Sequence, residues 1–386
     1  MVPVLYLALL AAPLALSANS TTTVIPDLAG DLGLSITDAT WTATAFGWAT
    51  VLGAPLATGL IRRYGMRFAV YAHAVLVMAG TVLVVAAPAL PVLLAGRAAQ
   101  AAGGGGLALV AMALAGTARR TGVVTASIGL LGAFGPLAGS TLGAASWRLP
   151  LCLSLVALPA IPLVIRRLPP RDRDTAPTTT DVTGIALVMT LVSALVLIAR
   201  LRVPALIAAM VAAVLLAAHI RRRPDGFVPT AVLRSAVFRT AVATAFTLST
   251  SYFLVLYTVP RLLEEHRSPG WIGTMTLAAL AAGSLTSMLF ATRTARLGPT
   301  VTRTVLLATG ATALVLTVTA PGPAAEVAAT GFAVFATTAA LAWYAARVGR
   351  AAPEGHRTGA LGLLTLCYQL GGAFGPALAT VLIRTT

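Results

Sequence analysis

One arginine lies inside a long apolar stretch of the sequence, where a charged side chain is costly. Arg97 belongs to the apolar run 89–116 and precedes Gln100 by three residues. A charge near mid-bilayer costs about 2.5–3.5 kcal/mol on insertion scales, so Arg97 is a functional-site hypothesis. We expect it to face the interior of a helix bundle, held by helix carbonyls, Gln100 or a neighbouring hydroxyl. The alternative is that Arg97 lies near the outer end of its helix and extends to the surface.

A second feature is a glycine stripe in the string GLLGAFGPLAGSTLG. Gly135, Gly139 and Gly143 fall at i, i+4 and i+8, so one helix face carries no side chains and another helix can approach closely. Pro136 lacks an N–H group, which weakens the helix locally and can bend it. Ordinary helix packing is the simpler interpretation of such a stripe.

Acidic residues are few and lie outside the centres of the apolar runs. Proton-coupled carriers commonly use a buried carboxylate whose pKa is raised by desolvation. This sequence offers no clear one, and the substitutes are Asp27, Asp31, Glu326 and His219. Each of these four can equally be a solvated loop residue or an interface residue.

The composition defines the class of protein that must position these residues. The 386 residues are 58% hydrophobic and 10% charged, with a mean hydropathy of +0.90, whereas soluble proteins are about 25% charged. A soluble enzyme, a disordered protein and a secreted disulfide scaffold are excluded. All 27 basic residues are arginine, which excludes a P-loop lysine and Schiff-base chemistry. We expect no cofactor and no metal, and we interpret Cys152 and Cys367 as small packing residues.

Thirteen apolar runs approach the roughly 20 residues that a membrane helix needs. They are residues 2–25, 41–61, 68–87, 89–116, 122–145, 148–165, 182–199, 203–220, 239–260, 270–292, 302–320, 324–346 and 358–383. With a cytoplasmic N-terminus, the inner loops hold 20 arginines and the outer segments hold 6, which is the asymmetry of a membrane protein rather than of a nucleic-acid binder. A signal peptide over 2–18 is the alternative for the first run, but it lacks a basic start.

The spans predict an all-α polytopic membrane protein in four parts. These parts are a six-helix bundle over 1–165, a cytoplasmic linker over 166–181, two accessory helices over 182–220, and a bundle of about five helices over 239–386. An internal repeat supports two related halves, because Gly132–Pro136 (GAFGP) recurs as Gly372–Pro376. The copies lie in helices that correspond in two parallel halves once the accessory pair is set aside.

The string of the fifth span, followed by Ser146-Trp147-Arg148, resembles the fifth-helix antiporter motif of the major facilitator superfamily. The branch that it resembles is the fourteen-helix drug:proton antiporters. Four other segments are similar to motifs of that branch: Trp41–Phe46, Thr58–Arg67, Arg97–Gly103 and Asp181–Gly184. The resemblance implies a major facilitator fold with two pseudo-symmetric bundles and two extra central helices. It implies coupling or gating roles for Arg97, Gln100, Gly135, Pro136, Gly139, Arg62, Arg63 and Gly65.

The sequence departs from the family pattern at several positions. Arg62 stands where the loop motif usually has Asp, and Thr58 stands where that motif begins with Gly. Ser17 occupies the place of an Asp in the first helix. The fourteenth helix is expected to be missing.

The expected function is export of a small amphipathic compound, such as a drug, antibiotic or secondary metabolite, in exchange for protons. The aromatic and amide residues that could line an apolar cavity are Asn19, Phe46, Phe134, Tyr252, Tyr257, Trp343, Tyr368 and Gln369. Neutral or anionic amphiphiles suit Arg97. We expect a monomer in a bacterial cytoplasmic membrane, with no nucleic-acid partner. The alternatives are a facilitator or exchanger without proton coupling, and a membrane receptor or scaffold that no longer transports.

Overall fold

The computed structural model describes residues 2–168, 181–264, 267–294, 297–319, 322–353 and 355–383, and within these ranges the regular secondary structure is helical. The helices are α1 (Val4–Ala11), α2 (Pro13–Asp31), α3 (Ile36–Ala39), α4 (Trp41–Tyr64), α5 (Met66–Val85), α6 (Leu90–Ala115), α7 (Ala118–Ala133), α8 (Gly135–Gly143), α9 (Arg148–Leu151), the 3-10 helix η1 (Cys152–Ala157), α10 (Ala160–Ile165), α11 (Val182–Leu201), α12 (Val203–Arg222), α13 (Thr230–Arg234), α14 (Ala236–Glu264), α15 (Pro269–Arg293), α16 (Pro299–Thr319), α17 (Pro323–Ala351) and α18 (Arg357–Ile383). Residues 169–180, most of the predicted linker, lie outside the described residues.

These helices coincide with the thirteen predicted spans. Eleven segments of the described chain are long and apolar enough to cross a membrane. The remaining two predicted spans, 182–199 and 358–383, lie on α11 and α18. The first span is divided into α1 and α2, the fifth into α7 and α8, and the sixth into α9, η1 and α10. The all-helical polytopic architecture predicted from the hydropathy pattern is therefore confirmed.

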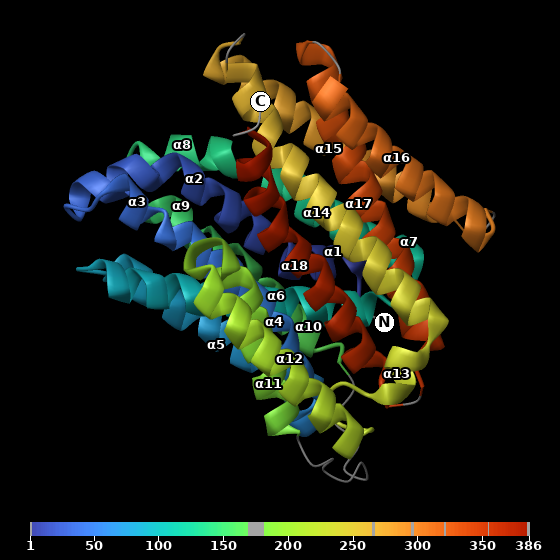
Figure 1. Ribbon diagram of the computed structural model, residues 1–386. Coiled ribbons are helices and arrows are strands. Elements are labelled where there is room, and N and C mark those ends of the chain that lie inside the picture. The colour runs from blue at the N-terminus through green and yellow to red at the C-terminus, as the bar shows by residue number, and fades with distance from the viewer. Residues whose placement is uncertain are drawn as a thin grey trace.

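The helices form two bundles with matching internal packing. In the N-terminal bundle α6 packs against α4 and α5, and in the C-terminal bundle α17 packs against α15 and α16 in the same relation. Likewise α2 packs on α7 and α8, while α14 packs on α18. Figure 1 shows α2 and α8 on the left, α15 and α16 at the upper right, and the accessory helices α11 and α12 at the bottom.

The internal repeat occupies equivalent contacts in the two bundles. A Cβ placed on Gly135 of α8 would lie 2.5 Å from the Cβ of Asn19 on α2. A Cβ placed on Gly375 of α18 would lie 2.5 Å from the Cβ of Phe253 on α14. The two copies of GAFGP therefore serve the same purpose, which is to let the fifth helix of each half approach the first helix of that half closely.

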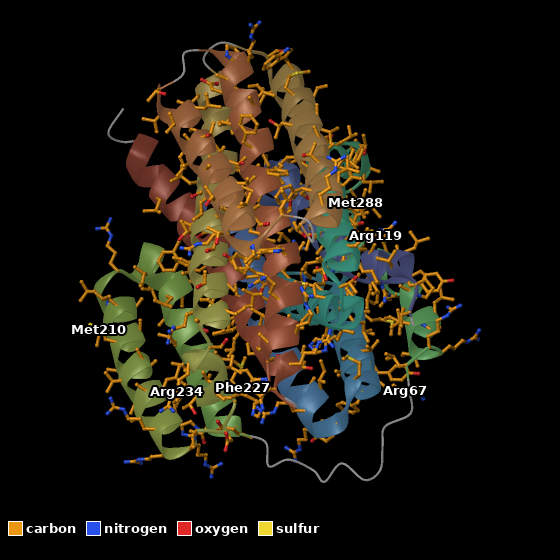
Figure 2. The ribbon with its side chains drawn as sticks, turned by 90° about the vertical axis from the view of Figure 1, so that its right-hand side faces the viewer. Arg67, Arg119, Met210, Phe227, Arg234 and Met288 are labelled. Atoms are coloured by element: carbon orange, nitrogen blue, oxygen red, sulfur yellow. The ribbon has the colours of Figure 1, made fainter. Side chains whose placement is uncertain are left out.

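The accessory helices form a hairpin on the outer side of α4. The two helices pack mainly on each other, and α11 also contacts α4. The Trp48 Nε1 of α4 donates a hydrogen bond to Ser193 Oγ of α11 over 2.8 Å. The other side of α12 is uncovered, as Met210 shows with 62% exposure (Figure 2).

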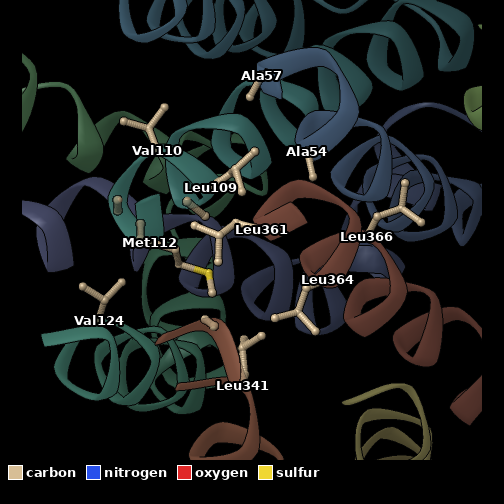
Figure 3. Close-up of a cluster of buried hydrophobic side chains, with 14 of the residues drawn as sticks. Ala54, Ala57, Leu109, Val110, Met112, Val124, Leu341, Leu361, Leu364 and Leu366 are labelled. Atoms are coloured by element: carbon tan, nitrogen blue, oxygen red, sulfur yellow. The ribbon is translucent and has the colours of Figure 1, made fainter. Parts of the chain in front are cut away.

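The two bundles are packed together toward one end, which we call the arginine-rich end, and they also touch at mid-height. It carries Arg62, Arg63, Arg120, Arg167, Arg221–Arg223 and Arg347. The largest apolar cluster lies toward this end and contains residues of both bundles, including Ala54, Leu109 and Met112 with Leu361 and Leu364 (Figure 3).

At the opposite end each bundle has its own apolar cluster. One cluster contains Val24, Leu28 and Trp147 of the N-terminal bundle. The other contains Val259 and Leu263 of the C-terminal bundle. The bundles thus share an apolar cluster toward the arginine-rich end and have separate apolar clusters at the other end.

Candidate functional site

Arg97 lies at the centre of a buried hydrogen-bond network in the N-terminal bundle. Its side chain, on α6, is completely buried. One terminal nitrogen donates to Ser17 Oγ over 3.1 Å and to Gln100 Oε1 over 2.9 Å. The other donates to the Ser17 carbonyl over 3.3 Å and to Thr21 Oγ1 over 2.6 Å. The guanidinium therefore joins α6 to α2 and does not extend to the surface.

Gln100 and Phe46 extend this network to three more segments. Gln100 Nε2 donates to Thr81 Oγ1 of α5 over 2.9 Å and to the Leu151 carbonyl at the end of α9 over 3.0 Å. The Phe46 ring of α4 covers the guanidinium, with 4.1 Å between the Arg97 Cζ and the ring centroid. Arg97 and Gln100 together therefore connect α2, α4, α5, α6 and α9, so a shift of any of these helices alters the network.

The charge of Arg97 has no counter-ion in the described part of the chain. The ion pairs there are those of Arg148 with Asp31 and of His219 with Asp181. Ser17, at the position where the family pattern has Asp, accepts from Arg97 as a neutral hydroxyl. The Nε–H of Arg97 has no hydrogen-bond partner. Burying an uncompensated charge is costly. A cation held by neutral acceptors alone is therefore stabilised when an anion approaches it or when the conformation of the protein changes so that the cation is less buried.

The predicted glycine stripe packs on α2. A Cβ on Gly139 would overlap the Thr23 hydroxyl and lie 2.5 Å from the Ser20 carbonyl oxygen, and one on Gly143 would lie 2.8 Å from Val24 Cγ1. Asn19 Nδ2 donates to the Gly132 carbonyl over 2.8 Å across the same seam. The chain is divided into α7 and α8 at Phe134, directly before Gly135 and Pro136. The stripe thus lies against the helix that carries the Arg97 acceptors Ser17 and Thr21.

We predict that Gly139→Ala destabilises the protein and Gly47→Ala does not. The new Cβ at Gly139 meets backbone atoms of α2 that cannot move aside, and overpacking of this kind costs about 1–3 kcal/mol. Gly47 lies in a helix too, but a Cβ there meets nothing within 4 Å. Thermal unfolding in detergent measures both variants. Equal melting temperatures for the two would contradict the close packing.

The residues of the loop motif lie at the arginine-rich end. Arg62 donates to the Gly226 carbonyl over 3.0 Å, which links α4 to the turn after the accessory hairpin. Arg63 stacks on the adjacent Tyr64 ring at 5.0 Å. Gly65 separates α4 from α5 with a φ of 88°, a left-handed conformation that favours glycine.

Glycines also form the seal between the bundles. A Cβ on Gly362 of α18 would overlap the Thr58 hydroxyl of α4. A Cβ on Gly122 of α7 would lie 2.8 Å from the Cβ of Ala291 on α15. At these two contacts the bundles pack through small side chains against glycine backbone. Helix α4 can therefore separate from α18, and α7 from α15, without long side chains having to be withdrawn from between them.

The predicted cavity residues are scattered over different environments. Phe46 and Trp343 are only 4% and 6% exposed, so in this conformation both are packed inside the protein. Phe134 and Tyr257 are 43% and 45% exposed. Contact of any of these residues with a substrate stays a prediction.

Two of the predicted cavity residues lie together on α18, and a third, Tyr252, lies on α14 of the same bundle. Tyr368 and Gln369 are half-buried, and the Gln369 Oε1 is a buried acceptor without a partner. Tyr252 packs on a small cluster made by Ala133 of α7 and Leu280 of α15, where the two bundles touch at mid-height. The unpaired amide oxygen of Gln369 is suited to accept a hydrogen bond from a ligand.

The predicted proton sites are placed near the helix ends. Asp31 accepts from Trp147 Nε1 over 2.8 Å and pairs with Arg148 over 3.1 Å. These contacts join the end of α2 to the start of α9 at the end of the N-terminal bundle opposite the arginine-rich end. Asp27 is exposed and Glu326 is half-buried in the first turn of α17. His219 pairs with Asp181, so it is a structural partner rather than a free loop residue.

Sequence reasoning missed His73, a completely buried histidine on α5. Its Nδ1 lies 2.6 Å from the Ala69 carbonyl oxygen and therefore donates to it, while Nε2 has no partner. The ring fills the notch that Gly106 leaves on α6. The only signal in the sequence is a polar residue within an apolar run, which does not reveal this fit.

Paired helical bundles, spans of membrane length and a seal at one end define a polytopic membrane carrier. A sequence profile of the Major Facilitator Superfamily matches residues 7–376, and the chain belongs to this superfamily. It is therefore a multi-pass membrane protein of a superfamily of secondary transporters.

Comparison with known proteins gives the same fold. The structure is similar to the human organic anion transporter MFSD10, with a TM-score of 0.66 and 17% identity over 97% of this chain and 91% of that one. It is similar to the proton:xylose symporter XylE, with a TM-score of 0.63 and 14% identity over 99% and 89% of the two chains. The fucose:proton symporter FucP of E. coli gives 0.58 and 16% identity over 99% and 92%.

The curated relative matches a smaller region. MFS transporter L2 of Phoma sp. is 31% identical over 142 residues, which is 35% of this chain and 24% of that protein. The match thus spans about a quarter of the length of the relative.

Proposed function

We propose that the protein exports small amphipathic compounds by proton-coupled antiport, with alternating access between the two bundles. The observation that carries this proposal is the Arg97 network, in which one buried cation without a counter-ion and its partner Gln100 together join five helical segments. A charge kept at this cost, and connected to so many helices, is suited to couple ligand or proton binding to helix movement.

The substrate is an anionic or neutral amphiphile such as a drug, antibiotic or secondary metabolite. Arg97 gives the N-terminal bundle an uncompensated positive charge, which favours anions and disfavours cations at short range. The exposed ring of Phe134 and the half-buried Tyr252 lie next to the mid-height contact between the bundles. Aromatic walls with few polar anchors, such as the Gln369 amide, suit a flat apolar molecule.

Transport proceeds by rocking of the bundles about their shared contacts. The seal at Thr58–Gly362 and Gly122–Ala291 opens while the separate clusters at the opposite end come together. The excess of arginine in the loops at the sealed end supports a cytoplasmic position for that end and for the N-terminus. The described conformation then faces outward, and after the substrate is released to the exterior the carrier takes up a proton there and returns with it to the cytoplasmic side.

Proteoliposomes test the coupling directly. We expect the initial rate of uptake of an active dye, chosen from a panel of anionic, neutral and cationic amphiphiles, to rise at least about tenfold when the lumen is made acidic. A sodium gradient of equal size is the control and is expected to have no effect. An unchanged initial rate with an imposed pH gradient would exclude proton antiport.

A facilitator or exchanger without proton coupling is the second candidate. It is favoured by the burial of the acidic residues. Among the acidic side chains that the structure describes, only Asp181 is buried, and Asp181 caps the start of α11 and is therefore not available to carry a proton. This candidate predicts exchange of labelled for unlabelled dye with no response to the pH gradient. A transport-inactive receptor or scaffold predicts no dye movement in either assay.

A further inference from the structure

The buried carboxylate of Asp181 holds a turn of the chain by hydrogen bonds. Its Oδ1 accepts from the Gly184 N–H over 2.9 Å and lies 2.7 Å from His219 Nε2. Its Oδ2 accepts from the Phe227 N–H over 2.8 Å. One carboxylate therefore joins the start of α11, the end of α12 and the turn over 223–228.

The Asp181 carboxylate is closely packed by the backbone of its hydrogen-bond partners. The side chain is only 7% exposed. A Cβ on Gly226 would lie 2.5 Å from Asp181 Oδ2, and a Cβ on Gly184 would overlap the same atom. Burial raises the pKa of Asp181, but the N–H groups of Phe227 and Gly184 and the His219 ring outweigh burial and hold that pKa below its usual value. The carboxylate is thus ionised at neutral pH and accepts from all three donors.

The turn held by Asp181 is also part of the seal. Phe227 and Val228, which follow Gly226, are 3% and 8% exposed and belong to the apolar cluster shared by the two bundles. Figure 2 shows Phe227 at the arginine-rich end, near Arg234 of α13. Because this cluster contains residues of both bundles, the turn is packed at the place where the bundles meet.

Arg62 connects the turn to the helix that closes the seal. Its guanidinium donates to the Gly226 carbonyl over 3.0 Å. On the same part of α4, Thr58 seats on Gly362 of α18, and a Cβ on Gly59 would lie 2.8 Å from Ile185 Cδ1 of α11. Adjacent residues of α4 thus contact the C-terminal bundle on one side and the accessory hairpin on the other.

We propose that Asp181 is a positioning residue for the sealed state: it fixes the 223–228 turn so that the Gly226 carbonyl holds Arg62, and Arg62 in turn keeps α4 seated on α18. The accessory hairpin (α11 and α12) therefore supports α4 on the side that faces away from α18. This inference concerns the gate and holds for a facilitator as well as for a proton-coupled exporter.

The test measures how often the arginine-rich end opens. The reporter is Ser284→Cys in a Cys152→Ser/Cys367→Ser background, because Ser284 is completely buried between the bundles and its hydroxyl has no hydrogen-bond partner. The rate of labelling by a water-soluble maleimide, measured on full-length protein in nanodiscs, reports exposure of this site. Thermal unfolding confirms that each variant is folded.

We expect Asp181→Asn to raise the labelling rate roughly tenfold, the factor that corresponds to about 1.4 kcal/mol. The Asn amide group cannot accept from both sides, so the Phe227 N–H or the His219 ring loses its acceptor. Arg62→Met, which removes the donor, is expected to give the same increase, whereas Arg62→Lys keeps a donor for Gly226 and stays near the parent rate. The double variant Asp181→Asn/Arg62→Met is expected to equal either single variant, because both act through one bond.

The matched control is Asp225→Asn, which removes an exposed carboxylate from the same turn. It is expected to leave the labelling rate unchanged. An unchanged rate in a folded Asp181→Asn protein, multiplied effects of Asp181→Asn and Arg62→Met in the double variant, or an equal increase in Asp225→Asn would each overturn the proposal. Should Asp181→Asn fail to fold, the comparison of Arg62→Met with Arg62→Lys decides, since loss of the donor alone must open the arginine-rich end.

Discussion

Arg97→Met is expected to lower the transport rate by about two orders of magnitude while the protein remains folded. Methionine fills a similar volume and removes a buried charge that has no counter-ion, so the cost of burying that charge disappears. The free energy of unfolding is expected to fall by only about 1–3 kcal/mol, because Gln100 Oε1 loses its donor. Transport fails because α2, α6 and the Phe46 ring are no longer joined through one cation.

The control for Arg97→Met is the same substitution at Arg303. This residue lies on α16 and is exposed, so the change in composition is the same and the buried network stays intact. Uptake of dye into proteoliposomes and thermal unfolding are measured for both variants. Parent-like transport by Arg97→Met, or an equal loss in Arg303→Met, would remove Arg97 from the coupling machinery.

Gly362→Ala is expected to shift the carrier toward the state that is open at the arginine-rich end. The added methyl group overlaps the Thr58 hydroxyl, which is buried and already bonded to the Ala54 carbonyl over 2.9 Å. Overpacking costs about 1–3 kcal/mol, and a cost of that size changes the ratio of the two states by about 5- to 150-fold. Maleimide labelling of Ser284→Cys, as described above, measures the shift.

Two further variants make this result specific to the seal. Thr58→Ala combined with Gly362→Ala exchanges the sizes of the two partners and is expected to restore slow labelling. Gly359→Ala adds the same methyl group to α18 at a position where a Cβ meets nothing within 4 Å, and is expected to have no effect. Rapid labelling in the Thr58→Ala/Gly362→Ala protein would show that contact between these residues does not hold the seal.

The hydropathy pattern was sufficient to predict the spans, because each helix must bury its backbone groups within about 20 apolar residues. The sequence also led us to expect that Arg97 is buried, since a charge inside a membrane needs polar partners, and Gln100 was one of three kinds of acceptor expected for it beside helix carbonyls and a neighbouring hydroxyl. Thr21 and Thr81 could not be predicted in this network. They come from other helices, and a threonine in a span is more often bonded to its own backbone.

The seal could not be predicted for a similar reason. Thr58 departs from the family pattern, and its partner Gly362 is 304 positions away, a pairing that only the packing of α4 on α18 reveals. Asp181 was expected to be part of a motif at the start of a helix, whereas His219 was expected to be a candidate proton site. The turn over 223–228 brings them together, and its path depends on tertiary contacts that leave no local pattern.

The lengths of the helices have a consequence for the lipid in which the carrier works. α11 and α12 have 20 residues each, so each is about 30 Å long and matches the hydrocarbon thickness of an ordinary bilayer without tilt. α14 and α17 have 29 residues each, about 43 Å, and can absorb a change in thickness by tilting. Hydrophobic mismatch therefore acts first on the hairpin that supports α4, so acyl-chain length becomes a means of adjusting how readily the carrier changes state.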